Sequence, residues 1–156
     1  MPKSGPKRRK PVPRFSSEDT EREFWAKADL TAAEREVFEA QLLLEDGKPE
    51  RAGRTAYLAM VHAARGLIRT EYLDIPDNEE TVVSEFEKRF YSTQKFFDPF
   101  VGGKFAQYFF AAHKAVGEAY TPESAHRLIE EAQLFIEASH SCYNRLGAST
   151  HSVVKV

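Results

Sequence analysis

Histidine, cysteine and arginine are the side chains in this chain that could carry acid–base or nucleophilic chemistry. The five histidines are His62, His113, His126, His140 and His151. No HExxH, CxxC or ExxH pair is present, and His126 and His140 lie about 21 Å apart if they share one helix. The sequence therefore predicts no metal site and no cofactor. Its single cysteine, Cys142, is expected to be a buried thiol and can form no internal disulfide.

Glycine and aromatic residues cluster between positions 96 and 110. The pair Gly102-Gly103 lacks the Lys-Ser/Thr of a phosphate loop, so we interpret it as a turn. The nearby rings have two interpretations, a core packed under a loop or an exposed base-stacking platform. The helical spacing from Phe105 to Phe109 favours the core. The rings concerned are Phe96, Phe97, Phe100, Phe105, Tyr108, Phe109 and Phe110.

The N-terminal segment differs in charge from the rest of the chain. It holds six basic side chains and no acidic one: Lys3, Lys7, Arg8, Arg9, Lys10 and Arg14. The remainder carries 16 basic and 24 acidic residues, a net charge of −8. Such a basic arm, kept extended by prolines, indicates contact with a phosphate backbone or an acidic partner; a solubilising tail is the alternative. Lys7, Arg8, Arg9, Lys10 and Arg14 are its predicted binding residues.

Apolar periodicity predicts helices throughout, and strand-like alternation is absent apart from the tail 153–156. Ser16 and Ser17 predict a short helix to about Ala28, and a capping box at Thr31 predicts a second helix that ends at Gly47. Further helices are expected over 49–68, with an alanine-rich stripe, over about 79–90 after an Asn78 cap, over 105–116, and from Thr121 to Gly147.

These elements predict an all-α fold, an antiparallel bundle of four to five helices. The expected organisation is a basic arm over 1–15, a short helix over 16–30, the bundle over 31–147 and a tail over 148–156. No run approaches the roughly 20 apolar residues of a transmembrane helix, and no signal peptide is evident, so we expect a cytoplasmic protein. The alanine-rich stripe also predicts a homodimer formed through the long helices.

The segment Glu39–Ile68 resembles HEPN domains, a family of helical bundles. An Ala/Leu helix that ends in Gly precedes a long helix with Tyr57, Met60 and His62-Ala63-Ala64. The resemblance continues at Val82–Tyr91, at Glu118–Tyr120 and in the last helix, and covers about residues 32–146. It implies a bundle that commonly dimerises and that is linked to RNA or nucleotide chemistry, often in toxin–antitoxin systems.

Ribonuclease members of that family use an Arg followed by a His four to six residues later. The resemblance carries this role to Arg145 and His151. Because Gly147 is expected to end the helix between them, a non-catalytic module is favoured over a metal-independent ribonuclease. Arg54, His62 and Arg65 are the further residues predicted to bind a ligand, and His62 has the alternative of an ordinary bundle histidine.

A shorter resemblance covers residues 10–31, which look like the opening of CopG-type antitoxins. The matching residues are Phe15, Ser17, Glu18, Glu23, Phe24 and Trp25. This implies a segment that binds a partner protein. The leading hypothesis is a non-catalytic, homodimeric HEPN-like module that binds RNA, a nucleotide or a partner protein through its arm and aromatic loop. A ribonuclease toxin and a structural subunit of a larger complex are the alternatives.

Overall fold

A computed structural model describes the backbone of residues 17–155 and the side chains of residues 17–147. The described chain is all-helical and contains no β-strand. Its elements are α1 (Glu18–Glu45), α2 (Pro49–Ile68), α3 (Glu79–Phe86), a π-helical turn (Glu87–Tyr91), α4 (Lys104–Lys114) and α5 (Pro122–Lys155).

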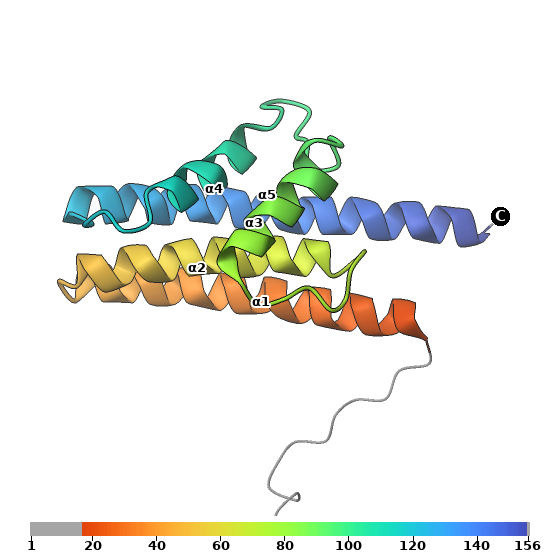
Figure 1. The fold of residues 1–156 in the computed structure, drawn as a ribbon, viewed down its shortest axis with the longest axis horizontal. Coiled ribbons are helices and arrows are strands. Elements are labelled where there is room, and N and C mark those ends of the chain that lie inside the picture. The colour runs from red at the N-terminus through yellow and green to blue at the C-terminus, as the bar shows by residue number, and fades with distance from the viewer. Residues whose placement is uncertain (1–16, 156) are drawn as a thin grey trace, which may run out of the picture.

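The three long helices α1, α2 and α5 lie side by side, and each packs against the other two (Figure 1). The short helices α3 and α4 lean toward one another above them, and the segment that joins them stands at the top of the view (Figure 1). The prediction of an all-α bundle is confirmed. The helix lengths differ from the prediction, because three helices rather than two are long.

Helix α1 begins at the predicted cap, where the Ser17 hydroxyl accepts a hydrogen bond from the Thr20 amide. It then continues without interruption to Glu45, so the prediction of two helices split near residue 30, with a second cap at Thr31, is wrong. The stretch between contains no Gly or Pro, and Asp29, which lies at the predicted split, is paired inside the bundle. The helix ends where Gly47 adopts a positive φ of 77°.

Helix α2 is the centre of the bundle. Twelve of its twenty residues are buried, among them Ala52, Ala56, Ala59 and Ala63. Small side chains allow α1 to approach closely: a Cβ added at Gly66 would lie 2.9 Å from the Ala26 carbonyl oxygen. The alanine-rich stripe is therefore covered within one chain, which removes the reason given above for a dimer through this helix.

A cluster of phenylalanines fills the space between α3, α4 and α5. Phe86 lies at its centre, with ring centroids 5.2 Å from Phe96, 5.6 Å from Phe109 and 5.6 Å from Phe135. All four are buried. The core interpretation of the aromatic cluster is thus confirmed for Phe96 and Phe109.

The predicted helix starts after residue 70 are confirmed, and one predicted end is wrong. Asn78 caps α3 by accepting from the Thr81 amide, and Thr121 accepts from the Ser124 amide at the start of α5. Gly147 does not end α5, whose backbone stays helical to Lys155. A single glycine weakens a helix by only about 1 kcal/mol relative to alanine. The predicted end of the last helix at Gly147 is therefore wrong.

Charged residues join α1 to α2 inside the bundle. The Asp29 side chain, 9% exposed, lies 3.2 Å from Arg65 and 3.2 Å from Arg69. Arg65 also pairs with the exposed Asp77 at 2.8 Å. Two arginines thus share one buried carboxylate, which compensates its removal from water.

We predict that Asp29→Asn lowers the free energy of unfolding by about 3 kcal/mol, because it leaves two largely buried arginines without their shared carboxylate. Asp77→Asn is the matched control, since it removes the exposed partner of the same Arg65 and should cost at most about 1 kcal/mol. Urea unfolding of the two variants measures both values. Equal losses would show that the buried carboxylate has no special role.

Candidate functional site

Arg54, the first of the predicted binding residues on α2, ties this helix to the start of α3. Its Nη2 donates to Glu79 Oε2 at 2.7 Å, and its guanidinium lies 5.5 Å from the centre of the Tyr57 ring. The side chain is still 46% exposed. Arg54 is therefore charge-compensated on one side and accessible on the other.

A tyrosine–histidine pair lies beneath Arg54. The buried Tyr57 hydroxyl and His113 Nδ1 are 2.8 Å apart, and His113 Nε2 is 3.7 Å from the exposed Glu80. Burial, helped by the nearby Glu79 carboxylate, holds the pKa of Tyr57 well above its ordinary value. Tyr57 thus stays a neutral phenol that links α2 to α4, and it is not an available base or nucleophile.

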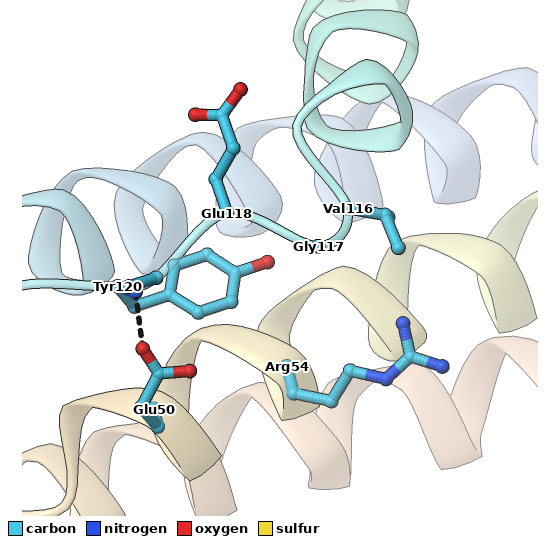
Figure 2. A pocket seen from close by; sticks show the side chains of 7 residues that line it. Glu50, Arg54, Val116, Gly117, Glu118 and Tyr120 are labelled. Carbon is cyan, nitrogen blue, oxygen red and sulfur yellow. Dashed lines mark hydrogen bonds between the residues drawn. The ribbon is translucent and has the colours of Figure 1, made fainter.

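A cavity of about 530 Å³ opens beside these residues, between the first turns of α2 and the loop from α4 to α5. Figure 2 shows the Tyr120 ring between Glu118 and Glu50, with Arg54 across the opening below Val116. The Tyr120 amide donates to Glu50 Oε2 at 2.5 Å. The ring covers Gly53, where a Cβ would lie 2.4 Å from it.

This cavity has a mixed charge and no catalytic pair. Glu50 and Glu118 face a single cation, Arg54, which already pairs with Glu79. Carboxylates at the opening repel a phosphate group, so the cavity does not fit the anionic ligand expected of a nucleotide site. It can accommodate a small polar group, but its lining residues include no nucleophile with a neighbouring base.

His62 and Arg65, the other binding residues predicted on α2, bind acidic residues of the same chain. His62 Nδ1 lies 2.6 Å from Glu36 Oε1 of α1, and Arg65 pairs with Asp29 and Asp77. Arg65 is about 16 Å along the helix from Arg54. The structure therefore brings Arg54, His62 and Arg65 into separate contacts, and no common cationic site forms.

The aromatic turn, residues 97–102, is the most exposed apolar feature of the described chain. Phe100 is 93% exposed and Phe97 is 45% exposed, whereas the adjoining Phe96 is buried. The turn projects from the segment that precedes α4, and the exposed interpretation of the aromatic cluster applies to it alone. Sequence spacing could not make this division, because Phe96, Phe97 and Phe100 all lie outside any helix.

Hydrogen bonds hold the aromatic turn in one shape. The Asp98 and Gly102 backbones exchange hydrogen bonds of 3.0 and 2.7 Å, and the Asp98 carboxylate accepts from the Phe100 and Val101 amides. Gly102 has a φ of 64°, which confirms a turn at this glycine pair. Phe100 is thus presented to solvent by a closed turn whose backbone is already ordered.

Arg145 lies below this turn and has a structural contact. Its Nη2 donates to the Lys95 carbonyl at 3.2 Å, and the buried Cys142 thiol donates to the same oxygen at 3.4 Å. The expectation of a buried thiol is confirmed, and burial raises the pKa of Cys142 to about 11. The side chain of His151 lies outside the described residues.

The arm residues Lys7, Arg8, Arg9, Lys10 and Arg14 also lie outside the described residues. Within residues 17–147, no group of three or more His, Cys, Asp or Glu side chains could hold a metal ion. No helix of the described chain is long and apolar enough to span a membrane.

Comparisons with known proteins give no match: no family model, no curated protein and no solved structure is similar to this chain. The resemblances to HEPN domains and CopG-type antitoxins therefore remain proposals.

Tyr57 and Tyr120, which line or adjoin the cavity, belong to the residues that carried the first resemblance. The contacts of Tyr57 with His113 and of Tyr120 with Gly53 were not visible in the sequence, because the two members of each pair lie in different elements of the fold.

The His62–Glu36 pair should make the free energy of unfolding depend on pH. The hydrogen bond that His62 donates to the Glu36 carboxylate raises the pKa of His62 above its ordinary value. The imidazole of His62 therefore binds its proton more tightly in the folded state than in the unfolded state. The pair stabilises the folded state fully at pH values below the pKa that His62 has in the unfolded chain. This stabilisation is lost as the pH rises through the pKa that His62 has in the folded state.

We expect His62→Gln to cost on the order of 1 kcal/mol near pH 5.5 and clearly less near pH 8.5. Urea unfolding at both pH values measures the difference from the wild type. His126→Gln is the control, since His126 is 64% exposed and pairs only with Glu130 of its own helix. A cost of His62→Gln that grows with pH would contradict the assignment.

Proposed function

We propose that this chain is a non-catalytic helical binding module of the HEPN type, whose ligand is a partner protein held through the aromatic turn. The observation that carries the proposal is Phe100, 93% exposed on a hydrogen-bonded turn. Leaving a phenylalanine in water forgoes about 2 kcal/mol of burial. A turn that keeps such a ring exposed without freedom to fold it inward supplies an anchor for an apolar pocket of a partner.

Charge favours a protein over RNA as the ligand of this surface. The chain outside the arm carries a net charge of −8, and the cavity near Arg54 is lined by carboxylates. RNA binding depends on clustered cations that neutralise phosphates. Of the predicted cationic residues on α2, Arg54 and Arg65 are each paired with acids. A module in an accessory role, as in toxin–antitoxin pairs, fits this distribution.

Phe100→Ala should abolish partner binding and leave the free energy of unfolding within about 0.5 kcal/mol, because the ring is almost fully exposed. Tagged wild type and variant are used to capture partners from the source cells in parallel with and without nuclease treatment, and protein and nucleic acid are recovered separately. Val116→Ala is the matched control, because Val116 is an exposed apolar residue that lies outside the aromatic turn, in the loop between α4 and α5.

The supporting result is a defined protein bound by the wild type and by Val116→Ala, and lost from Phe100→Ala. If all three recover the same proteins, the aromatic turn is not the binding surface. If RNA is the only molecule that Phe100→Ala fails to recover in the capture without nuclease treatment, the turn acts as a base-stacking platform.

The ribonuclease alternative depends on Arg145 and His151. Because α5 is continuous, no flexible connection separates Arg145 from His151. Residues six apart on a helix nevertheless lie about 9 Å apart along the axis and point about 120° away from one another. Arg145 is also engaged with the Lys95 carbonyl. A catalytic pair needs both groups at one phosphate, with hydrogen-bond distances near 3 Å.

We therefore expect the wild type to cleave neither structured nor unstructured RNA without added metal. Arg145→Ala and His151→Ala should give the same gel pattern as the wild type. Cleavage by the wild type that both changes remove would establish the ribonuclease and overturn the non-catalytic proposal.

A further inference from the structure

The outer side of α1 carries an apolar strip flanked by acids. Phe38 is 60% exposed and Leu42, one turn later, is 49% exposed. Two hollows adjoin them: a groove of about 240 Å³ between α1 and α5, and one of about 400 Å³ at the end of α1. We call this surface the acidic strip. Its acids are Glu34, Glu39, Glu45, Asp46 and Glu137.

The charges around the strip restrict its occupant. Lys48 pairs with Asp46 at 3.2 Å, and His140 lies 2.8 Å from Glu34, which leaves Arg35 as the remaining cation on this part of α1. Packing two copies of the strip against one another would place acids against acids, and RNA would be repelled. The surface is suited to a cationic segment that also carries apolar side chains.

The chain itself contains such a segment directly before α1. Residues 3–15 hold six cations, no acid, and the apolar residues Val12 and Phe15. Proline favours the polyproline II spacing of about 3.1 Å per residue, so Lys10 and Lys7 can lie about 22 and 31 Å from Ser17. At 1.5 Å per helical residue, the same distances along α1 reach about Thr31 and Phe38. The cations are therefore spaced to meet the strip in the same chain.

An exposed path connects the two ends of this span. Phe24, Thr31 and Phe38 are seven residues apart and lie along one side of α1, and all three are exposed. A segment that turns back at Ser17 can follow them to the acidic strip without crossing another helix.

We propose that residues 7–10 bind the acidic strip of their own chain, with Lys7 and Lys10 beside Glu34, Glu39 and Glu137. Residues 7–10 then lie beside Phe38, and their cations are withheld from other acidic or phosphate ligands. This surface is separate from the aromatic turn, and the proposal does not depend on the partner protein proposed above.

Carbodiimide cross-linking of the full chain tests this contact, because it joins a lysine to a carboxylate only where the two touch. We expect amide bonds from Lys7 or Lys10 to Glu34, Glu39 or Glu137, with a yield that falls about fivefold between low salt and about 0.5 M salt. The double change Glu34→Gln with Glu137→Gln should remove most of them. Glu123→Gln with Glu130→Gln, two exposed acids elsewhere on α5, is the matched control.

A mixture of ¹⁴N- and ¹⁵N-labelled protein distinguishes the possible occupants. Cross-links within one isotope support binding in the same chain, and mixed-isotope products in statistical amounts would overturn it in favour of a second copy. Cross-links from Lys7 and Lys10 spread equally over Glu85, Glu118 and Glu123 would overturn it in favour of an arm with no defined site.

Discussion

The close contact between α1 and α2 determines much of the remaining structure. It is possible because α2 presents alanines and Gly66 to its neighbours, and a Cβ at Gly66 would meet the Ala26 carbonyl oxygen at 2.9 Å. At this separation, side chains of ordinary length on the two helices must interdigitate or pair. Asp29 therefore meets Arg65, and Glu36 meets His62. The same packing turns Phe38 and Leu42 outward, away from the bundle.

Polar residues of α2 serve the packing of the bundle, and this limits what they can bind. A buried carboxylate without a partner would cost several kcal/mol, so Asp29 keeps Arg65 and Arg69 in place. Arg54 is similarly occupied by Glu79, and Tyr57 by His113. Exposed groups on the loops and on the outer helix faces are therefore better placed to recognise a ligand than the basic residues of the central helix.

Sequence reasoning identified most helix starts because their causes are local. Ser17, Asn78 and Thr121 each cap the helix that they were expected to cap. It failed at Thr31, where the neighbouring Asp29, Leu30 and Ala33 are buried in the bundle and the helix continues, and at Gly147, where one glycine does not stop the helix. Arg54, His62 and Arg65 were predicted to bind a ligand because they are basic residues on one helix. The sequence does not show which acidic residues they pair with. Asp29, Glu36 and Glu79 lie 36, 26 and 25 positions away from them.

The aromatic turn and the acidic strip lie over different parts of α5. The turn lines a small hollow together with Ala138, Ser141 and Arg145, whereas the groove of the strip is bordered by Gln133, Ile136 and Glu137. On a helix with 100° per residue these two sets point about 120° apart. A segment bound at the strip therefore leaves Phe100 accessible, and coupling between the two surfaces would require a shift of α5 itself. Phe135 resists such a shift, because its ring is packed against Phe86, Phe96 and Phe109. The two surfaces should consequently bind their ligands independently.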